Sequence, residues 1–566
     1  MPGIFGFTLT DQNRAMAATV LAKMLELATH GPSYKHDPLF QDGSLCGGRT
    51  HTNIIQLHEQ PYSDANVHVW LHGEFYNQEE LSPQSNSNRS DASLLSALFR
   101  ECQGFEFLRR IDGIYAAVIY DANRRQVHLL NDRYGLRHLF WRVNGRSLAW
   151  ASEVKSMIGL QDFRPTVDPQ AAKDLWSFGY LRDNRTWFRD VELLPPASVL
   201  TWNLDRESAS HLTYWRMGET RICPERTDAD MHARIHSLFL DAIRRRTADN
   251  LRMGVTLSGG LDSRLVFATL PKKCDPVATV TFGRQGSDDV RIACRVNKLR
   301  SSRSRFCAVS PSNWLPPRVE GVWWTDGMLD LTHMHSVHML PALTSEMDVA
   351  LGGFLGDAVI GGTYLTRPPL SEIENYNQPG RRFVGEGSVL QEVALPSRHP
   401  FMDNALFDYC LSINPEKRIH AKLYTAFLLK YFPEFYEDIE SPKIGVPLRW
   451  LYPRPGIEEF TLPVRRRLAG ILRYSKERLG WSGAYEQYWR WVTQPPARDF
   501  IERLLFQGTP MYPEYLDRND VRSVWDRHIH PSKDSELPTE QLCRAMTAEI
   551  WLQQVFKGKR VWEHFQ

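Results

Sequence analysis

Long apolar runs and a strong charge imbalance are both missing from the sequence. No stretch reaches the roughly 18 apolar residues that a membrane-spanning helix needs. Lys and Arg number 68 against 66 Asp and Glu, and a formal net charge of +2 argues against a protein that coats nucleic acid or an anionic membrane. The first residues, MPGIFGFTLTDQNR, lack the basic-then-apolar order of a secretory signal. We therefore expect a soluble, cytoplasmic protein that has neither a membrane nor a nucleic acid as its partner.

Cysteine is also scarce, and its spacing excludes two common uses. The 8 cysteines contain no CxxC pair, so the sequence predicts neither a zinc site nor a disulfide framework. They stand at positions 46, 102, 223, 274, 294, 307, 410 and 543. We expect most of them to be buried, reduced thiols.

The chain has two parts of different composition. Its 566 residues, 42% of them hydrophobic, are enough for several domains with their own cores. Residues 1–205 are rich in short β-type runs broken by a few helical stretches, which predicts an α+β sandwich. Residues 206–230 are polar and are interpreted as a linker. Residues 231–566 alternate apolar strands and helices from residue 251 and become mostly helical later, which predicts a parallel α/β sheet with a helical extension from about residue 457.

The most informative motif is SGGLDS at residues 258–263, which follows a predicted strand and precedes a helical run. Its two glycines permit a tight turn, so that backbone N–H groups can converge on a phosphate, and Ser258 and Ser263 add hydroxyl donors. The pattern GxxxxGK[ST] is absent, which argues against an NTPase that transfers the γ-phosphate. A glycine-rich turn alone is often only a tight loop, but the strand-to-helix context favours phosphate binding.

SGGLDS resembles the pyrophosphate loop of the ATP pyrophosphatase superfamily. In that superfamily the loop holds the β- and γ-phosphates of ATP while a nucleophile attacks the α-phosphate. The resemblance therefore implies that ATP is bound by Ser258, Gly259, Gly260, Asp262 and Ser263.

A second glycine-rich segment, LGGFLGDAVIGG at residues 351–362, follows another predicted strand. Its Asp357 and the Asp262 of the first loop place two carboxylates at strand ends, and these are the hard oxygen ligands that Mg²⁺ prefers beside a polyphosphate. The alternative is that Asp357 only caps a helix. We predict that Asp262 and Asp357 bind Mg²⁺ and that Gly356 belongs to the nucleotide site.

Eleven motifs then occur in one order along the chain. The first half contains MPGIFGF, THGPSYK, LHGEFYNQEEL, SDASLLSAL, IDGIYAAVIYD, NDRYGLRHLF and ASEVKSMI, and the second half contains SGGLDS, GGFLGD, SRHPFMD and PKIGVP. Over roughly residues 1–450 this series resembles the asparagine synthetase superfamily, which includes asparagine synthetases, β-lactam synthetases and lasso-peptide macrolactam cyclases. The resemblance implies an Ntn-hydrolase-like glutaminase domain, an ATP pyrophosphatase-type synthetase domain, and amide formation that releases AMP and pyrophosphate.

The first half departs from that family at its catalytic position. Glutamine-hydrolysing members have Cys as residue 2, whose thiol is the nucleophile, whereas this chain has Pro2. The family's oxyanion-hole Asn is His72 here. Four positions still match the family's glutamine contacts, namely Arg49, Gly73, Glu74 and Asp91. We predict a degenerate domain without glutaminase activity.

The second half keeps one catalytic position and loses another. Lys443 in PKIGVP matches the family's catalytic Lys, whose charge is implied to stabilise the α-phosphate and the developing oxyanion. Phe354 stands where other branches have Glu or Tyr, so a base for the amine is missing there. Glu386 is the nearest analogue of an amine-assisting Glu, with a solvated loop acid as the alternative. Arg264, where many relatives have Ser, either reaches phosphate or pairs on the helix surface.

Two further segments have alternative interpretations. Residues 361–387 have the Pro, Gly and charge content of a mobile cover beside the adenylate site. Its Arg367, Arg381 and Arg382 either recognise an anionic group or are surface charges. His333, His335 and His338 do not share one helical face, so we expect them to line the acceptor pocket or to be structural rather than to bind a metal.

Together these features predict an ATP- and Mg²⁺-dependent carbon–nitrogen ligase that joins a small-molecule or peptide carboxylate to an amine without hydrolysing glutamine. A ring closure, as in lactam or lasso-peptide antibiotic biosynthesis, is one form of that reaction. A precursor-peptide-processing protein or a second copy of the chain is the expected protein partner. The alternatives are an asparagine synthetase-like enzyme that uses free ammonia on a small acid, and a non-catalytic nucleotide-binding protein.

Overall fold

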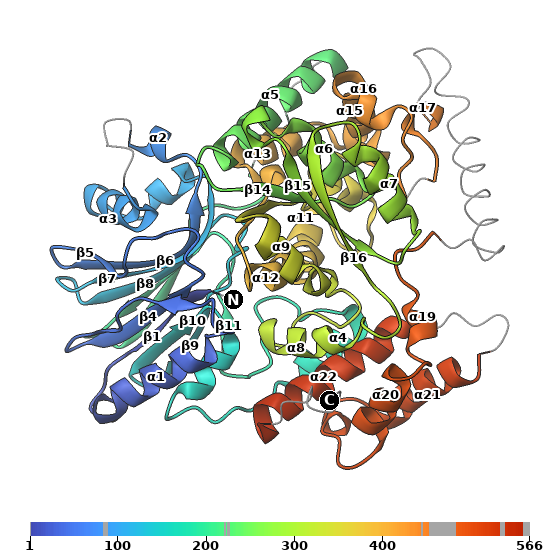
Figure 1. Ribbon diagram of the computed structural model, residues 1–566. Coiled ribbons are helices and arrows are strands. Elements are labelled where there is room, and N and C mark those ends of the chain that lie inside the picture. The colour runs from blue at the N-terminus through green and yellow to red at the C-terminus, as the bar shows by residue number, and fades with distance from the viewer. Residues whose placement is uncertain are drawn as a thin grey trace.

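The computed structural model describes residues 2–82, 89–219, 222, 227–442, 445–451, 483–531 and 538–558. Figure 1 shows a β-sandwich beside a second domain built on a parallel sheet, with a group of C-terminal helices below the second domain. Across the described ranges, no helix combines the length and the apolar character needed to cross a bilayer.

The first domain is a sandwich of two antiparallel sheets. In order across the first sheet, the strands are β11 (Glu192–Leu193), β9 (Phe140–Asn144), β10 (Ser147–Ala151), β1 (Gly3–Thr8), β4 (Leu45–His51) and β2 (Lys35–His36), with β3 (Phe40–Gln41) also on β4. The second sheet has the order β13 (Ser208–Thr213), β12 (Ser198–Asn203), β8 (Gln126–Asn131), β7 (Gly113–Asp121), β6 (Val67–Phe75) and β5 (Tyr62–Asp64). Trp70, Trp150 and Trp202 belong to the apolar cluster that both sheets contribute to.

Helices cover the sandwich on its two outer faces. The helix α1 (Ala17–Leu27) packs beside β1 and β4, and α3 (Asp91–Glu101) packs on β6 and β5. Because α3 covers the outer face of the second sheet, β7 is buried along its whole length rather than alternating. The α+β sandwich predicted for this half is confirmed. The strand β13 lies within residues 206–230, so part of the predicted linker pairs with β12, and α5 (Asp228–Arg246) begins after its cap Thr227.

The second domain is built on a five-stranded sheet in which every pairing is parallel. Its order is β16 (Ser302–Ala308), β15 (Val277–Gly283), β14 (Met253–Thr256), β17 (Val349–Leu351) and β18 (Ser397–Arg398). The chain starts in the middle at β14, adds β15 and β16 on one side, and then returns to add β17 and β18 on the other. The carboxyl ends of β14 and β17 therefore flank the point where strand order reverses, which is where open α/β sheets bind ligands. The predicted α/β parallel sheet is confirmed.

The helices of this domain connect and cover the sheet. The principal ones are α6 (Leu261–Thr269), α7 (Asp288–Asn297), α8 (Pro316–Trp324), α9 (Leu340–Glu346), α10 (Gly356–Val359), α11 (Glu372–Asn375), α12 (Gly385–Glu392), α13 (Asn404–Ser412), α15 (Lys422–Tyr431) and α16 (Pro433–Tyr436). The C-terminal region is helical as predicted, with α19 (Tyr488–Trp491), α20 (Ala497–Phe506), α21 (Arg518–Ile529) and α22 (Thr539–Lys557). The helix α22 packs against α8 and against α4 (Pro169–Phe178) of the first domain, so it joins the two domains.

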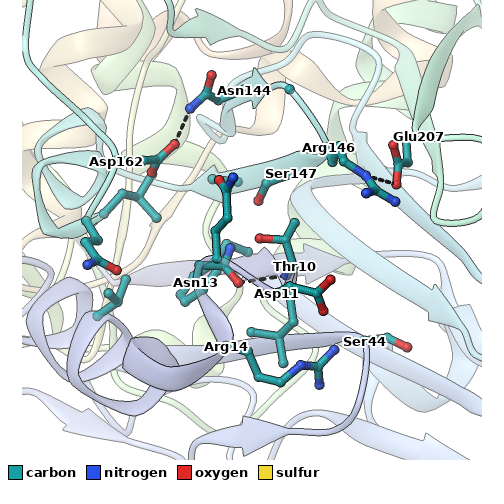
Figure 2. A pocket seen from close by; sticks show the side chains of 18 of the residues that line it. Thr10, Asp11, Asn13, Arg14, Ser44, Asn144, Arg146, Ser147, Asp162 and Glu207 are labelled. Atoms are coloured by element: carbon teal, nitrogen blue, oxygen red, sulfur yellow. Dashed lines mark hydrogen bonds and ion pairs between the residues drawn. The ribbon is translucent and has the colours of Figure 1, made fainter.

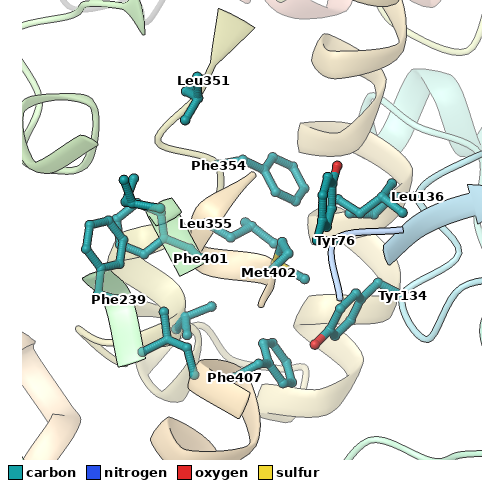
Figure 3. Close-up of a cluster of buried hydrophobic side chains, with 14 of the residues drawn as sticks. Tyr76, Tyr134, Leu136, Phe239, Leu351, Phe354, Leu355, Phe401, Met402 and Phe407 are labelled. Carbon is teal, nitrogen blue, oxygen red and sulfur yellow. The ribbon is translucent and has the colours of Figure 1, made fainter. Parts of the chain in front are cut away.

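The two domains share a buried interface. Figure 3 shows Tyr76, Tyr134 and Leu136 of the first domain in one apolar cluster with Phe354 and Phe407 of the second. The ring of Tyr134 lies 5.0 Å from that of Phe407 in an edge-to-face arrangement, a geometry that aromatic pairs prefer. The sandwich therefore packs directly against the side of the synthetase-like domain that carries the switch point.

Candidate active site

The SGGLDS segment forms a closed turn between β14 and α6. The Ser258 hydroxyl accepts a hydrogen bond from the Gly260 N–H at 3.1 Å, and its oxygen lies 3.0 Å from the Ser263 hydroxyl. The Gly259 N–H donates to the Asp289 carboxylate at 3.1 Å. The N-cap residue of α6 is Gly260, which has no side chain to cap the helix, and the positive end of a helix dipole favours an anion at such a position. The predicted turn is therefore present, and its binding of phosphate stays a prediction.

The second glycine-rich segment packs against the first at the switch point. A Cβ atom on Gly353 would lie 2.6 Å from the Ser263 nitrogen, and one on Gly356 would lie 2.8 Å from the Asp262 carboxyl carbon. Leu355 has a φ of 57°, a left-handed conformation that is uncommon for this residue type. The Asp357 N–H donates to Oδ2 of Asp262 at 3.0 Å. These close approaches require glycine, and they bring together the two predicted metal-binding segments.

The carboxylates of Asp262 and Asp357 suit a Mg²⁺ site in which the protein supplies only two of the ligands. The residue that caps α10 is Leu355 rather than Asp357, so Asp357 does not act as the N-cap of that helix. No group of three or more His, Cys, Asp or Glu side chains suited to a metal occurs among the described residues. A Mg²⁺ ion held by these two acids would take its other ligands from phosphate oxygens and water, which is usual for this ion.

Two tyrosines from the far end of the domain reach the start of α6. The Tyr424 hydroxyl donates to Oδ1 of Asp262 at 2.8 Å, and the Tyr436 hydroxyl donates to the Leu261 carbonyl at 2.8 Å. Burial raises the pKa of both phenols well above the ordinary value, so both remain donors. Sequence reasoning missed both residues because no local motif connects them to the loop.

Arg264 neither reaches the candidate phosphate site nor pairs on the helix surface, so both interpretations of this residue are wrong. Its side chain is completely buried and donates to the carbonyl oxygens of Gly259 at 2.8 Å and Glu440 at 2.9 Å. It also donates to Phe435 at 3.1 Å and Ile439 at 3.3 Å. Arg264 therefore ties the phosphate loop to residues 435–440 instead of reaching phosphate or the helix surface, because its guanidinium is enclosed by backbone carbonyls.

The predicted catalytic Lys443 lies outside the described residues. The residue before it, Pro442, does contact the phosphate loop, since a Cβ atom on Gly259 would lie 2.7 Å from the Pro442 ring. The chain that leads to Lys443 thus reaches the candidate site, and the role of Lys443 stays a prediction.

Phe354 lies at the inner wall of the site against His399. Their ring centroids are 4.8 Å apart, and burial lowers the pKa of His399 to about 3. The imidazole is therefore neutral over the physiological range. The pair is aromatic and uncharged, at a position where the resemblance would imply a proton acceptor.

Glu386 lies on α12 at the interface with the first domain. Its carboxyl is 1% exposed, and Nε2 of His138 lies 3.4 Å from Oε1. Burial raises the pKa of Glu386 to about 8, although Arg382 and Arg381 oppose the shift. The alternative of a solvated loop acid is wrong because the side chain is enclosed. Its assignment as an amine-assisting group stays a prediction.

The segment 361–387 differs from the mobile cover that its composition suggested. It contains α11, a π-helical stretch (Tyr376–Val384) and the start of α12. Arg381 donates to the carbonyl oxygens of Gly135 and Leu194, and Arg382 donates to those of Leu181 and Arg185. Both side chains are buried against the first domain, so neither is a surface charge or a free anion receptor.

The three histidines of residues 333–338 are engaged in separate contacts. Nδ1 of His333 lies 2.9 Å from the Asp330 carboxylate, whose charge raises the pKa of His333. His335 stacks on Phe282 with a centroid distance of 5.6 Å, and Nε of Arg318 lies 3.3 Å from Nε2 of His338. The rings of His333 and His335 also lie 5.8 Å apart, and the expectation that the three histidines bind no metal stays a prediction.

The pocket that the resemblance assigns to glutamine is almost filled. It lies at the domain interface, and its volume is about 40 Å³, enough for about three waters and far below the roughly 300 Å³ of small-molecule sites. Arg137 and Glu392, which form a buried ion pair across the interface, are part of its lining. Pro2 and His72 also line it.

The matched glutamine contacts have other partners here. Arg49 pairs with Asp37 at 2.6 Å. Glu74 pairs with Arg398 of the second domain through both carboxylate oxygens, at 2.9 and 2.5 Å. Asp91 accepts hydrogen bonds from the side chains of Gln56 and Gln78 and from the Phe75 N–H. These charged groups are therefore satisfied within the protein.

A larger groove of about 780 Å³ lies in the first domain. Figure 2 shows its polar lining, with Asp162, Arg146 and Glu207 among the labelled side chains. Two ion pairs lie in this lining: Arg142 pairs with Asp162 at 2.9 Å, and Arg146 pairs with Glu207. All of its lining residues belong to the first domain, and it is separate from the phosphate loop.

Comparison with known families agrees with this architecture. Residues 1–215 match the glutamine amidotransferase domain, and residues 234–392 match the asparagine synthase family. The chain is therefore similar to an amidotransferase domain in its first part and to asparagine synthase in its second part.

The chain is also similar, at low identity, to named proteins. Asparagine synthetase [glutamine-hydrolyzing] 1 of Bacillus subtilis is 24% identical over 62% of this chain and 57% of its own length. A probable asparagine synthetase of Acanthamoeba polyphaga mimivirus is 27% identical over 78% of this chain and 86% of its own. Amidase chry2 of Gibberella zeae is 26% identical over 44% of this chain and 38% of its own. For amidase chry2 and for the asparagine synthetases 1, 2 and 3 of Bacillus subtilis, the aligned part spans only 31 to 57% of the relative's own length.

Proposed function

We propose that the protein is an ATP- and Mg²⁺-dependent ligase that adenylates a substrate carboxylate and joins it to an amine without hydrolysing glutamine. The observation that carries this proposal is the meeting of two glycine-rich loops at the switch point of the parallel sheet. There, the Asp357 N–H donates a hydrogen bond to the Asp262 carboxylate, and Asp262 lies in the first turn of α6. Similarity to relatives named as asparagine synthetases supports the same proposal.

In this proposal the loop from Ser258 to Ser263 binds the β- and γ-phosphates, with Asp262 and Asp357 as the acids that hold Mg²⁺. A substrate carboxylate oxygen attacks the α-phosphorus, and pyrophosphate leaves. An amine nitrogen then attacks the acyl carbon, the bond to AMP breaks, and the nitrogen loses a proton. Lys443 supplies a positive charge for the α-phosphate and for the oxyanion of the second step.

The source of the amine follows from the first domain. Pro2 provides no thiol, and the cavity of about 40 Å³ has no room for glutamine. We therefore propose that the amine is carried by a substrate, and that ring closure within one molecule is a natural form of the reaction. The aromatic wall of Phe354 and His399 supports an acceptor that brings its own nucleophilic amine in neutral form.

Pyrophosphate release tests the proposal directly. The purified protein is incubated with ATP, Mg²⁺ and a panel of carboxylates and amines, including aspartate with ammonia and candidate peptides, and products are analysed for loss of one water by mass spectrometry. Asp262→Asn should abolish pyrophosphate release. Asp348→Asn is the matched control, because Asp348 lies at the opposite end of β17 and pairs with Arg252 at 2.7 Å.

Each outcome separates the alternatives. Release that persists in Asp262→Asn would show that the metal assignment is wrong. Efficient formation of asparagine from aspartate and ammonia would favour a small-acid synthetase. ATP binding without pyrophosphate release for any substrate would favour a non-catalytic nucleotide-binding protein.

A further inference from the structure

The carboxylate of Asp262 is held from both sides. Oδ2 accepts the Asp357 N–H at 3.0 Å, and Oδ1 accepts the Tyr424 hydroxyl at 2.8 Å. One donor is a backbone group fixed by the second loop, and the other is a side chain that comes from α15. Two donors on different oxygens restrict rotation of the carboxylate plane, and this sets the direction in which its remaining lone pairs point.

The fold places Tyr424 at this position through a sharp bend before α15. His420 and Ala421 have φ values of 60° and 57°, and the Ala421 N–H donates to the Gly361 carbonyl at 3.1 Å. A Cβ atom on Gly361 would lie 3.3 Å from the Tyr424 ring, so the ring is seated directly against that backbone. The Tyr424 side chain is fully buried. The bend and the packing fix the position of the Tyr424 ring, and its hydroxyl donates to Asp262 from that position.

We propose that Tyr424 is a positioning residue that orients Asp262 for binding of the metal–ATP complex. This inference rests on the proposed function, in which Asp262 is a Mg²⁺ ligand. Groups that hydrogen-bond a metal ligand fix its orientation, and their loss typically lowers metal affinity by about 10- to 100-fold. Tyr424 does not contact the reacting atoms, so its effect is expected on metal binding before any effect on chemistry.

The chain offers a closely matched control in Tyr436. Its hydroxyl also donates at 2.8 Å to the first turn of α6, and its side chain is also fully buried. Its acceptor is the Leu261 carbonyl rather than the Asp262 carboxylate. Tyr424→Phe and Tyr436→Phe therefore each remove one buried hydroxyl and one hydrogen bond to adjacent residues, but only Tyr424→Phe releases the carboxylate.

The test measures Mn²⁺ binding by electron paramagnetic resonance in the presence of α,β-methylene-ATP, together with the Mg²⁺ dependence of pyrophosphate release. We expect Tyr424→Phe to raise the Kd for Mn²⁺ and the Mg²⁺ concentration at half-maximal rate by about 10-fold or more. Tyr436→Phe should leave both within about twofold of wild type. Thermal denaturation should show similar losses of stability in the two variants, which separates metal positioning from folding.

Equal Mn²⁺ affinity in wild type and Tyr424→Phe, or an equal weakening in Tyr436→Phe, would overturn the inference while the proposed function stands. Weaker Mn²⁺ binding in Tyr424→Phe alone, in a protein that releases no pyrophosphate with any substrate, would retain the inference and reject the proposed ligase. Absence of nucleotide-dependent Mn²⁺ binding in wild type would reject both.

Discussion

Replacement of Glu386 by Gln is expected to change stability in a way that depends on pH. Burial at the domain interface raises the pKa of Glu386 from 4.5 to about 8. Below pH 4.5 the carboxyl is protonated in both the folded and unfolded states. Between pH 4.5 and about pH 8 the folded protein keeps a proton that the unfolded chain has lost. The free energy of unfolding therefore falls as pH rises, by about 1.4 kcal/mol per pH unit and by about 5 kcal/mol in all at most. An amide does not titrate, so Glu386→Gln escapes this loss.

Urea denaturation of wild type and Glu386→Gln, followed by tryptophan fluorescence at pH 5 and pH 8.5, measures the effect. We expect similar midpoints at the lower pH and a clearly higher midpoint for the variant at the higher pH. Glu434→Gln, an exposed acid on α16, is the control and should show no pH-dependent difference. A difference between variant and wild type that is the same at both pH values would refute the reasoning. Pyrophosphate exchange that survives in Glu386→Gln while amide formation is lost would support Glu386 as the amine-assisting group.

Three further outcomes are expected. Gly353→Ala should lose ATP affinity in calorimetry because its Cβ would meet a backbone nitrogen at 2.6 Å, whereas Gly387→Ala, which has open space, should bind normally. Glu74→Gln should lower the midpoint of thermal unfolding by an amount equivalent to about 2 kcal/mol, because Arg398 would keep only the half-exposed Asp249 as an ionic partner; no change would show that the Glu74–Arg398 pair does not stabilise the fold. Glutamine should neither raise the midpoint of thermal unfolding nor yield glutamate in an enzymatic assay. Either result would contradict the proposal that the interface pocket of about 40 Å³ does not hold glutamine.

The parts of the site that the sequence predicted are those encoded within a few consecutive residues. A phosphate turn needs glycines and hydroxyls at fixed offsets after a strand, and SGGLDS carries all of them locally. The second loop carries its acid in the same way. Parallel pairing of the strands then places the carboxyl ends of both at the same edge of the sheet.

The parts that were wrong or missed depend on partners distant in sequence. Arg381 and Arg382 lie in a segment with Pro379 and Gly380, and their composition predicted a loop. They are helical and buried because carbonyl groups of the first domain accept their hydrogen bonds. Arg264 and Tyr424 likewise have roles set by groups more than a hundred residues away along the chain. No local pattern distinguishes such side chains from ordinary surface charges or core aromatics.

The same long-range pairing gives a physical reason for the chain to retain its first domain without the family's nucleophile. Glu74, to which the resemblance assigns a contact with glutamine, pairs with Arg398, the residue directly before His399. Arg137 fills part of the former pocket and pairs with Glu392. Removing one member of a buried ion pair leaves an uncompensated charge, which is strongly destabilising. The first domain therefore helps to fix the segment that carries His399, whose ring lies against Phe354, and these buried ion pairs hold the two domains together.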